Sequence, residues 1–421
     1  MRGILLVSTM LVVGLLFGQV ADEIPYTDNF VPVGMRAVAM GGAHIALAQD
    51  YSAAYYNPAL LGHIYANEVS GVISIRDGSD IASINNGPDR TEYFSAVKLN
   101  DLSLVLSPKA KRGGIAMALG YYRYQSFDKS TYFFGQRSAG DSIKALETND
   151  GGIGSYYFGI GGQVSKYVSV GATIEALVGA ENYTWDATIW GFEDSLVADS
   201  VFSDDITNDI SGVTGRFGVA VMPNKYFSWG LLVKFPSYIK IKQEYLAKTY
   251  VEKKDGYTDV IEDYQYDEDI ELLLPFQFGT GVAFKSPYVN LAADVLYSDW
   301  RGTRYYGPAY LVDENPYIPD SYRAVLSVGG GLEFTVPIKF LPTRIRFGYR
   351  FEPLAYKPYE YDKTRQMFTG GLAFLADKNF LIEISGFRTN WNQRYTTSSG
   401  NTIRENYDIF EVHLGVAYRF R

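Results

Sequence analysis

The chain of 421 residues contains no cysteine and only three histidines. Without cysteine it can form no disulfide, no cysteine-ligated zinc site and no lipidated N-terminus. The histidines are His44, His63 and His413, and no two of them have the spacing of a metal-binding pair. We therefore expect no metal, no cofactor and no enzymatic activity.

Basic residues are also in the minority. Lysine and arginine number 38 against 47 aspartates and glutamates, which gives a net charge of -9. An acidic chain without a basic stripe repels phosphate backbones, so nucleic acid is not an expected partner. Glycine and tyrosine, in contrast, are abundant, with 42 and 35 copies. This composition is too rich in both for an ordinary helical enzyme.

Long apolar runs are confined to the N-terminus. Arg2 precedes an apolar stretch from Ile4 to Phe17, and polar sequence follows. At about 14 residues the stretch is too short to span a bilayer comfortably, so residues 1–21 are interpreted as a secretory signal peptide. The alternative, a buried N-terminal helix, is disfavoured because the run has no polar face. No later stretch reaches about 18 apolar residues, so no transmembrane helix is expected in the mature chain.

Strict alternation of apolar and polar side chains runs through much of the remaining sequence. In residues 410–420 every second position, from Phe410 to Phe420, is apolar or aromatic, and His413 lies on the other face. Residues 343–352 alternate in the same way, with three arginines on one face. Burying such arginines in a core without water costs free energy, whereas a water-filled lumen tolerates them. The pattern predicts membrane strands with lipid-facing apolar sides, and it turns Glu175 and Asp294 toward the lumen.

The predicted strands number about 14, an even number as in bacterial barrels. Their expected ranges are 65–76, 92–107, 113–126, 153–165, 167–185, 210–222, 226–246, 269–285, 288–300, 320–336, 342–353, 367–376, 379–392 and 406–420. Short turns alternate with long loops, and the expected long loops include 127–152, 186–209, 247–268, 301–319, 354–366 and 393–405. A soluble sandwich or propeller has no reason to sort its loops in this way. The predicted fold is all-β, a transmembrane antiparallel β-barrel over residues 65–421.

Residues 22–64 precede this barrel. A barrel of about 14 strands encloses a lumen too wide for side chains alone to fill. The segment is dense in small residues, and Asp50 is placed to cap a short helix over residues 51–56. Asn57 followed by Pro58 predicts a second single turn. We therefore expect a compact hatch inside the lumen, and the alternative of a disordered leader is disfavoured by the content of Ala, Met and Tyr.

The sequence GMRAVAMGGAHIALAQDYSAAYYNPALLG, residues 34–62, resembles the N-terminal hatch of the FadL/TodX family of outer-membrane hydrophobic-compound transporters. The resemblance rests on the small residues, the acidic residue before a Ser/Ala-Tyr pair, and the tripeptide Asn57, Pro58 and Ala59. It implies a plugged barrel in the bacterial outer membrane that carries fatty acids or other apolar molecules inward without ATP. It also implies that the tripeptide lies near a kinked strand that offers a lateral exit.

An apolar ligand needs an apolar binding site among the outer loops, and this requirement selects the candidate ligand-binding residues. Loop 127–152 carries Tyr132, Phe133 and Phe134 as an apolar tip, and loop 186–209 adds Trp190 and Phe192. If the ligand has a carboxylate, a cation should meet it, and the candidates are Arg137, Arg216, Arg346 and Arg350. The alternative is that the arginines facing the lumen pair with glutamates of the lumen: Glu175, Glu333, Glu383 and Glu411.

The favoured function is passive uptake of hydrophobic molecules by a monomer in the bacterial outer membrane, with membrane lipid as its other partner. A nonspecific porin is a third possibility. The same N-terminal signature is also similar to PorV-like barrels, which implies an adaptor for protein secretion instead. Residues 252–271 are strongly acidic and are expected to form a solvated outer loop, with binding of divalent cations as the alternative.

Overall fold

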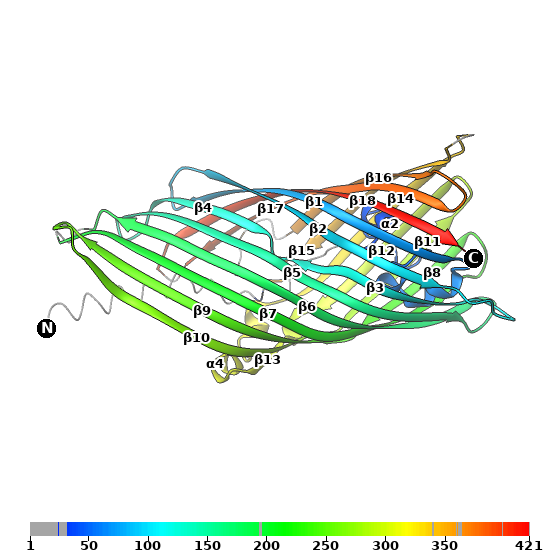
Figure 1. The fold of residues 1–421 in the computed structure, drawn as a ribbon, viewed down its shortest axis with the longest axis horizontal. Helices are drawn as coiled ribbons and strands as arrows, with labels where there is room; N and C mark the ends of the chain where they lie inside the picture. Colours follow the sequence, from blue (N-terminus) through cyan, green and yellow to red (C-terminus); the bar gives the residue numbers. More distant parts are fainter. Residues whose placement is uncertain are drawn as a thin grey trace.

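The computed structural model describes Ile24 and residues 32–192, 196–338, 341–358, 360, 364–397 and 399–420. The predicted signal peptide, residues 1–21, lies outside the described residues. The described chain is one antiparallel sheet closed on itself (Figure 1). Closure occurs at β1 (Asn67–Ile84), which pairs with β2 (Arg90–Leu106) on one edge and with β18 (Thr402–Phe420) on the other.

Eighteen strand segments build fourteen strands in the described part of the chain, because four strands are each interrupted once. The interrupted strands are β3 (Ile115–Ser126) with β4 (Lys129–Gln136), β8 (Phe227–Lys234) with β9 (Ser237–Lys253), β10 (Thr258–Leu274) with β11 (Gln277–Lys285), and β12 (Val289–Asp299) with β13 (Arg304–Gly307). The continuous ones are β1, β2, β5 (Ser142–Gln163), β6 (Val168–Trp190), β7 (Val197–Val221), β14 (Ala324–Val336), β15 (Thr343–Pro353), β16 (Thr364–Leu375), β17 (Phe380–Thr396) and β18. The predicted barrel of about 14 antiparallel strands is confirmed.

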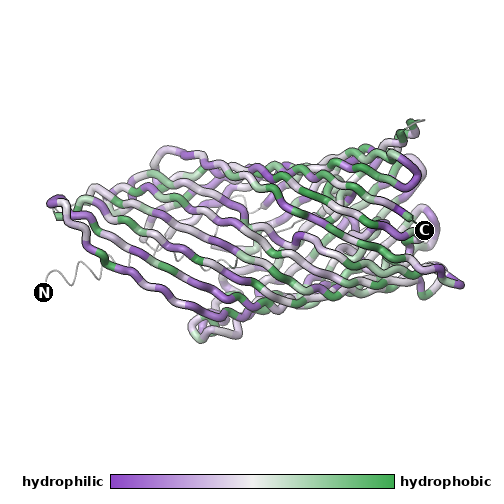
Figure 2. Tube along the Cα trace, viewed as in Figure 1, coloured by the Kyte–Doolittle hydropathy of each residue, from purple (hydrophilic) through white to green (hydrophobic). Residues whose placement is uncertain are grey.

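The two faces of the strands differ as the alternation predicted. Phe347, Phe410 and Leu414 are exposed on the outside, whereas Arg346 and His413 are buried on the inside. Hydrophobic positions are densest in the half of the barrel that contains the hatch (Figure 2). An apolar outer face over this height is what contact with acyl chains requires.

None of the helices that the structure describes has the length and apolarity that a membrane span requires.

The predicted long loops are the main correction to the strand boundaries. Ranges 127–152, 186–209 and 247–268 are mostly strand, because β4 to β7, β9 and β10 continue far past the apolar belt (Figure 1). Backbone pairing with the neighbouring strand holds these polar segments extended, so they need no apolar alternation. The acidic residues 252–271 are likewise mostly part of β10 instead of a loop. The predicted loop 301–319 contains the helix α4 (Ala309–Glu314) and the strand segment β13. It also includes parts of the helices η3 (Trp300–Gly302) and α5 (Ile318–Ser321).

The hatch is the set of residues 32–64, which fills the lumen at the end of the barrel that carries the short turns (Figure 1). It contains α2 (Met35–Ala39), α3 (Ala53–Tyr56) and η2 (Pro58–His63). The Asn57 side chain accepts a hydrogen bond from Ala59 N at 3.2 Å, which confirms the predicted second turn. Asp50 accepts from Ser52 N at 2.9 Å and so acts in the turn before α3, which begins at Ala53 and not at residue 51.

Candidate functional site

Glycines of the inner wall let the hatch approach the strands at backbone distance. A Cβ atom added to Gly348 would lie 2.2 Å from Gly41 N, and one added to Gly161 would lie 2.0 Å from Pro58 O. Contacts this close leave room for no side chain. The abundance of glycine therefore has a structural reason at these positions, since the wall must be thin where the hatch sits against it.

Polar side chains of the wall also hold the hatch backbone. The carboxylate of Asp294 on β12 accepts the N–H groups of His44 and Ile45 at 2.5 and 2.7 Å. The Asn57 amide of the hatch donates to Ile45 O at 2.9 Å and to Val219 O of β7 at 3.1 Å. Because isolated turns cannot satisfy their own peptide groups, these bonds replace water that the lumen would otherwise supply.

A buried ionic network ties the hatch to β14, β15 and β17. Arg36 of α2 donates to Glu333 at 2.6 and 3.0 Å, and Arg346 donates to the same carboxylate at 2.7 Å. Arg346 also reaches Glu383 at 2.6 Å. Only 1% of the Glu333 side chain is exposed, so its charge is compensated by the two guanidinium groups, and Arg36 depends on this carboxylate while Arg346 shares its charge between Glu333 and Glu383.

The other predicted cations are engaged as well. Arg216 donates to Glu175 at 2.5 Å and to Tyr55 O at 3.0 Å, and its guanidinium stacks over the Tyr55 ring at 3.9 Å. Arg137 forms an ion pair with Asp141, and Arg350 lies 3.7 Å from a carboxylate oxygen of Glu352. All four predicted arginines thus have an acidic neighbour in the chain. Their role in ligand binding stays a prediction, and the pairing that was its alternative is observed for Arg216 and Arg346.

Side chains packed at the outer end of the barrel form what we call the outer cluster. Its buried members are Ala82, Ile84, Phe133, Ile143, Ala145, Trp185, Ala187, Ile189, Phe202 and Ile403, and Tyr183, Phe192 and Tyr395 pack against them. The ring of Phe133 lies 5.7 Å from that of Trp185, and the ring of Phe134 lies 6.0 Å from that of Trp190. The predicted aromatic residues are therefore divided between two faces of the sheet: Phe133 and Phe192 pack in the outer cluster, and Phe134 pairs with Trp190 on the other face. However, the expectation of an exposed loop tip is wrong for Phe133, which is buried, and Tyr132 and Phe134 are half-buried on β4.

A second group of buried side chains, here called the middle cluster, was not predicted. It comprises Ile24, Phe127, Ile153, Leu177, Ile210, Ile239, Ile241, Ile270, Leu272, Leu274, Trp300, Ile318, Tyr322, Val325, Ala355 and Tyr356. Tyr395 packs against both the outer and the middle cluster. Apolar side chains therefore continue from the outer end toward the centre of the lumen.

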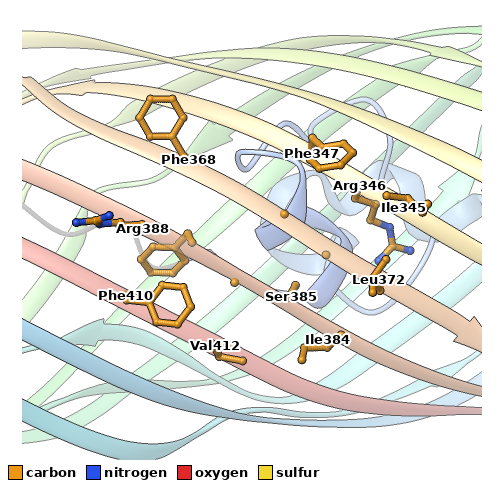
Figure 3. A pocket seen from close by; sticks show the side chains of 14 residues that line it. Ile345, Arg346, Phe347, Phe368, Leu372, Ile384, Ser385, Arg388, Phe410 and Val412 are labelled. Carbon is orange, nitrogen blue, oxygen red and sulfur yellow. The ribbon is translucent and has the colours of Figure 1, made fainter.

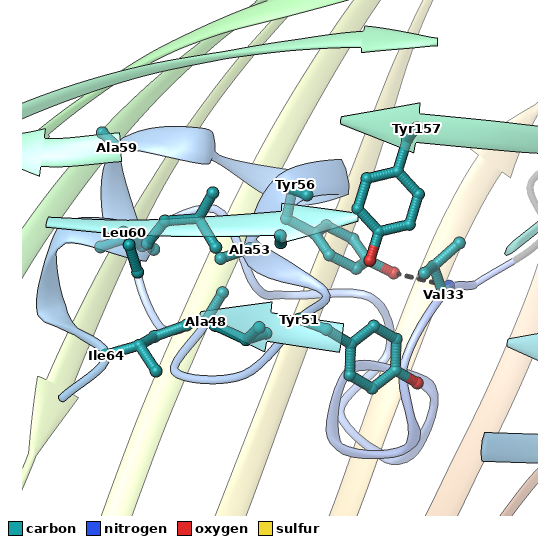
Figure 4. Packing of buried hydrophobic residues seen from close by; sticks show 14 of the residues in the cluster. Val33, Ala48, Tyr51, Ala53, Tyr56, Ala59, Leu60, Ile64 and Tyr157 are labelled. Atoms are coloured by element: carbon teal, nitrogen blue, oxygen red, sulfur yellow. Dashed lines mark hydrogen bonds between the residues drawn. The ribbon is translucent and has the colours of Figure 1, made fainter. Parts of the chain in front are cut away.

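The path reaches the hatch through a third group, the hatch cluster. It includes Val33, Ala48, Tyr51, Tyr56, Leu60, Leu61 and Ile64 of the hatch together with Val105, Tyr122, Tyr157 and Ala220 of the wall (Figure 4). Tyr124 packs against both the middle and the hatch cluster. The three clusters form one apolar sequence of contacts along the barrel.

A shift in the alternation marks where the middle cluster begins. Before Phe235 the outward positions are apolar, as at Leu231. After Pro236 the phase slips by one residue, so that Ile239 and Ile241 face the lumen and Lys240 is exposed on the outside. Counting alternating residues does not reveal this inversion. Following, residue by residue, which face of the strand carries the apolar side chains would have revealed it.

Beside the middle cluster, two neighbouring strand segments of the described barrel wall are not joined by backbone hydrogen bonds. Strand β2 pairs with β3 only over residues 101–106, and residues 90–100 pair only with β1 among the described residues. After Phe127 the chain resumes as β4, where Thr131 Oγ1 donates to the buried Asp80 of β1 at 2.7 Å. We call the boundary between residues 90–100 and β4 the seam. Lys98 Nζ and Asp128 Oδ1, 3.1 Å apart, form a side-chain contact across it.

A separate hollow of about 450 Å³ lies on the outer face of β15 to β18 (Figure 3). It forms where Gly370 and Gly386 leave a gap among outward side chains such as Phe347, Phe368 and Phe410. The inner side of the same wall touches the hatch, since a Cβ on Gly371 would meet Ala39 at 2.7 Å. The hollow is therefore separated from the lumen path by the wall.

A closed barrel of fourteen strands, with an apolar exterior and a hatch in its lumen, is the architecture of plugged outer-membrane β-barrels. Among solved structures the chain is similar to the toluene transporter TodX of P. putida, at 14% identity over 94% of this chain and 99% of that chain, with a TM-score of 0.66. It is also similar to a FadL homologue of Pseudomonas aeruginosa, at 12% identity over 94% of this chain and 100% of that chain, with a TM-score of 0.65. The toluene transporter TbuX of Ralstonia pickettii is similar at 15% identity over 94% of this chain and 99% of that chain, with a TM-score of 0.62.

No protein-family model and no curated protein sequence matches the chain. At 12 to 15% identity the structural likeness shows the fold, and the fold is that of the FadL-type hydrophobic-compound channels. The fold that the hatch sequence implied by resemblance is thereby confirmed.

Proposed function

We propose that this protein is an outer-membrane channel for the passive uptake of small hydrophobic molecules. The observation that carries the proposal is the unbroken series of apolar contacts from the outer cluster through Tyr395 to the middle cluster, and through Tyr124 to the hatch cluster. A polar solute gains nothing from such a surface, whereas an apolar one is stabilised along its whole length. Two of the similar structures are toluene transporters, which agrees with this proposal.

An uncharged cargo fits the lumen better than a carboxylate. The guanidinium groups of Arg216 and Arg346 already face Glu175, Glu333 and Glu383 at 2.5 to 2.7 Å. A fatty-acid head group would have to displace a buried carboxylate and leave it unpaired, which costs several kcal/mol. We therefore place aromatic hydrocarbons before long-chain fatty acids as cargo.

The seam is the proposed exit. Three strands hold the hatch by hydrogen bonds: Asp294 accepts from the hatch backbone, and the hydroxyls of Thr173 and Ser228 donate to it. Removing it would break all of these bonds at once, whereas the seam has no backbone bonds to break between β2 and β4. Phe127 joins the middle cluster where the third strand is interrupted, so cargo leaving there passes directly into the bilayer.

Uptake of radiolabelled toluene by cells that lack their own channel of this kind tests the proposal. The wild-type protein should raise the rate well above that of a plain porin. Phe127→Arg should abolish most of the gain, because a charge in the middle cluster opposes an apolar ligand. Phe127→Leu is the matched control and should keep most of it. Equal uptake by the wild type and the porin would overturn the proposal.

The wild-type protein and its Phe127 variants also distinguish the proposed channel from a secretion adaptor and from a nonspecific porin. A secretion adaptor would co-purify with secreted protein domains and would show no dependence of uptake on Phe127. A nonspecific porin would conduct ions in planar bilayers at a level that the hatch suppresses, so deletion of residues 22–64 would change toluene uptake little while raising conductance.

A further inference from the structure

The outer part of β10 is, like residues 90–100 of β2, an edge strand within the closed sheet. One side of β10 pairs with β9 along its full length, from Thr258 to Leu274. On its other side it pairs with β13 only at Glu271, Leu272 and Leu273. Among the described residues no backbone hydrogen bond reaches residues 258–267 from that side. About ten residues, or roughly 30 Å of strand, thus present unpaired peptide groups.

The two faces of this edge carry different side chains. On the inner face, Tyr264 and Tyr266 lie across from Ala247 and Tyr245 of β9. The ring of Tyr245 lies 5.8 Å from that of Tyr264 and 5.1 Å from that of Tyr266. The three tyrosine rings form what we call the tyrosine shelf on the inner side of the edge, and Glu262 and Glu268 bound it on the same face.

On the outer face three of the alternate positions are acidic and solvent-exposed. Asp263 and Asp267 flank the two tyrosines in sequence, with Gln265 between them, and Asp269 follows. The neighbouring position across from Asp267 on β9 is Glu244, which adds to the negative charge. The outer side of the edge is thus anionic, and the inner side is aromatic at Tyr264 and Tyr266.

Natural sheets normally protect a long edge, because it is a template for an added strand. Strand addition uses main-chain hydrogen bonds for affinity and alternate side chains for specificity. We propose that residues 258–267 bind an extended polypeptide segment of another protein as an added strand, with apolar side chains against the tyrosine shelf and lysine or arginine against the aspartates. A second copy of this chain is disfavoured, since its own aspartates would then face those of the first.

A synthetic peptide that alternates lysine with valine over ten residues tests this directly. Its binding to the full-length protein in detergent is followed by fluorescence polarisation at low salt. The same peptide with N-methyl groups on alternate residues should lose most of its binding, because it cannot complete the main-chain bonds. If both peptides bind equally, the contact is only electrostatic and strand addition is wrong.

Charge reversal provides a second, independent arm. Asp263→Lys with Asp267→Lys should weaken binding of the unmethylated peptide about tenfold, since two favourable cross-strand pairs become repulsive. Asp205→Lys with Asp209→Lys on β7 is the matched control: these residues have the same spacing and are exposed, but β7 is paired with β6 and β9 there. The control should bind like the wild type. An equal loss in both variants would overturn the proposal, and so would a wild type that sediments as a dimer built on this edge.

Discussion

The half of the barrel around the hatch and the half beyond it are built by the same strands but have opposite interiors. Around the hatch, the inner wall presents glycines and polar groups, such as Gly348 and Asp294, to a protein plug. Beyond it, the inner wall presents isoleucine and aromatic side chains, while lysines such as Lys240 turn outward. The difference shows that alternation alone does not specify which face of a strand contacts water. The neighbouring medium, lipid, plug or water, decides which residues each side carries.

The two halves also differ in closure. Around the hatch the described strands pair along both edges, whereas beyond it residues 90–100 and 258–267 each have an unpaired edge. Open edges are tolerated outside the hydrocarbon but cost several kcal/mol per unpaired group within it. The sealed half therefore belongs in the acyl chains. The seam begins at its boundary, where Val97 and Leu99 of β2 are still exposed apolar side chains on the outside, and residues 258–267 lie farther out.

The largest effect should come from the ionic network that fixes the hatch. Glu333→Gln should lower the free energy of unfolding by about 3–5 kcal/mol, because Arg36 and Arg346 lose a buried counter-charge. Urea unfolding of the protein in detergent measures it. Asp408→Asn removes the exposed pair with Arg388 and should cost at most about 1 kcal/mol. Similar losses for the two variants would mean that the hatch network is not buried in the way described.

The close approach of the hatch to the wall should be the next most sensitive feature. Gly348→Ala places a methyl group 2.2 Å from Gly41 N, so the backbone must shift at a cost of about 1–3 kcal/mol. The hatch should become cleavable by added protease. The adjacent-strand control, Gly370→Ala, meets nothing nearer than 3.6 Å and should behave as the wild type. A hatch that stays protected in Gly348→Ala would contradict the packing.

A smaller effect should appear as a dependence on pH. Burial lowers the pKa of His44 from 6.5 to about 4, and neither ring nitrogen has a hydrogen-bond partner in the part of the chain that the structure describes. The unfolded chain takes up a proton below pH 6.5 that the folded hatch does not. Stability is therefore full above pH 6.5 and falls as the pH drops toward 4, by about 2 kcal/mol at pH 5. His44→Phe keeps a ring and should remove this component when unfolding is compared at pH 8 and pH 5. An unchanged pH dependence would show that His44 does not stay neutral.

Much of this fold could be predicted from the sequence, because membrane strands carry a local signal. The alternation around Arg346 and His413 gave the correct inward and outward faces, and Asn57 with Pro58 correctly marked a turn of the hatch. The outer strand ends could not be found in this way. Polar segments such as 247–253 are extended only because β7 and β10 pair with them, and that pairing joins residues far apart in the sequence.

The candidate site was predicted in part. Of the predicted aromatic residues, Phe133 and Phe192 belong to the outer cluster, whereas Phe134 and Trp190 contact each other on the other face of the sheet, so their role as one binding site stays a prediction. The middle cluster was missed because its members come one or two at a time from many strands, and each looks like an ordinary strand residue. The seam was missed for a similar reason: residues 90–100 alternate normally, and their free edge is decided by the interruption of another strand at Phe127.

The route of the cargo can be tested by cross-linking, since the chain has no cysteine of its own. Lys98→Cys with Asp128→Cys, joined by a short bis-maleimide, closes the seam; Ala46→Cys with Ser228→Cys, joined in the same way, fixes the hatch to β8. Toluene uptake is compared before and after cross-linking in each variant, so that each uncross-linked protein is its own control. Uptake should fall about tenfold when the seam is closed and stay unchanged when the hatch is fixed. Loss of uptake on fixing the hatch, with none on closing the seam, would contradict lateral exit.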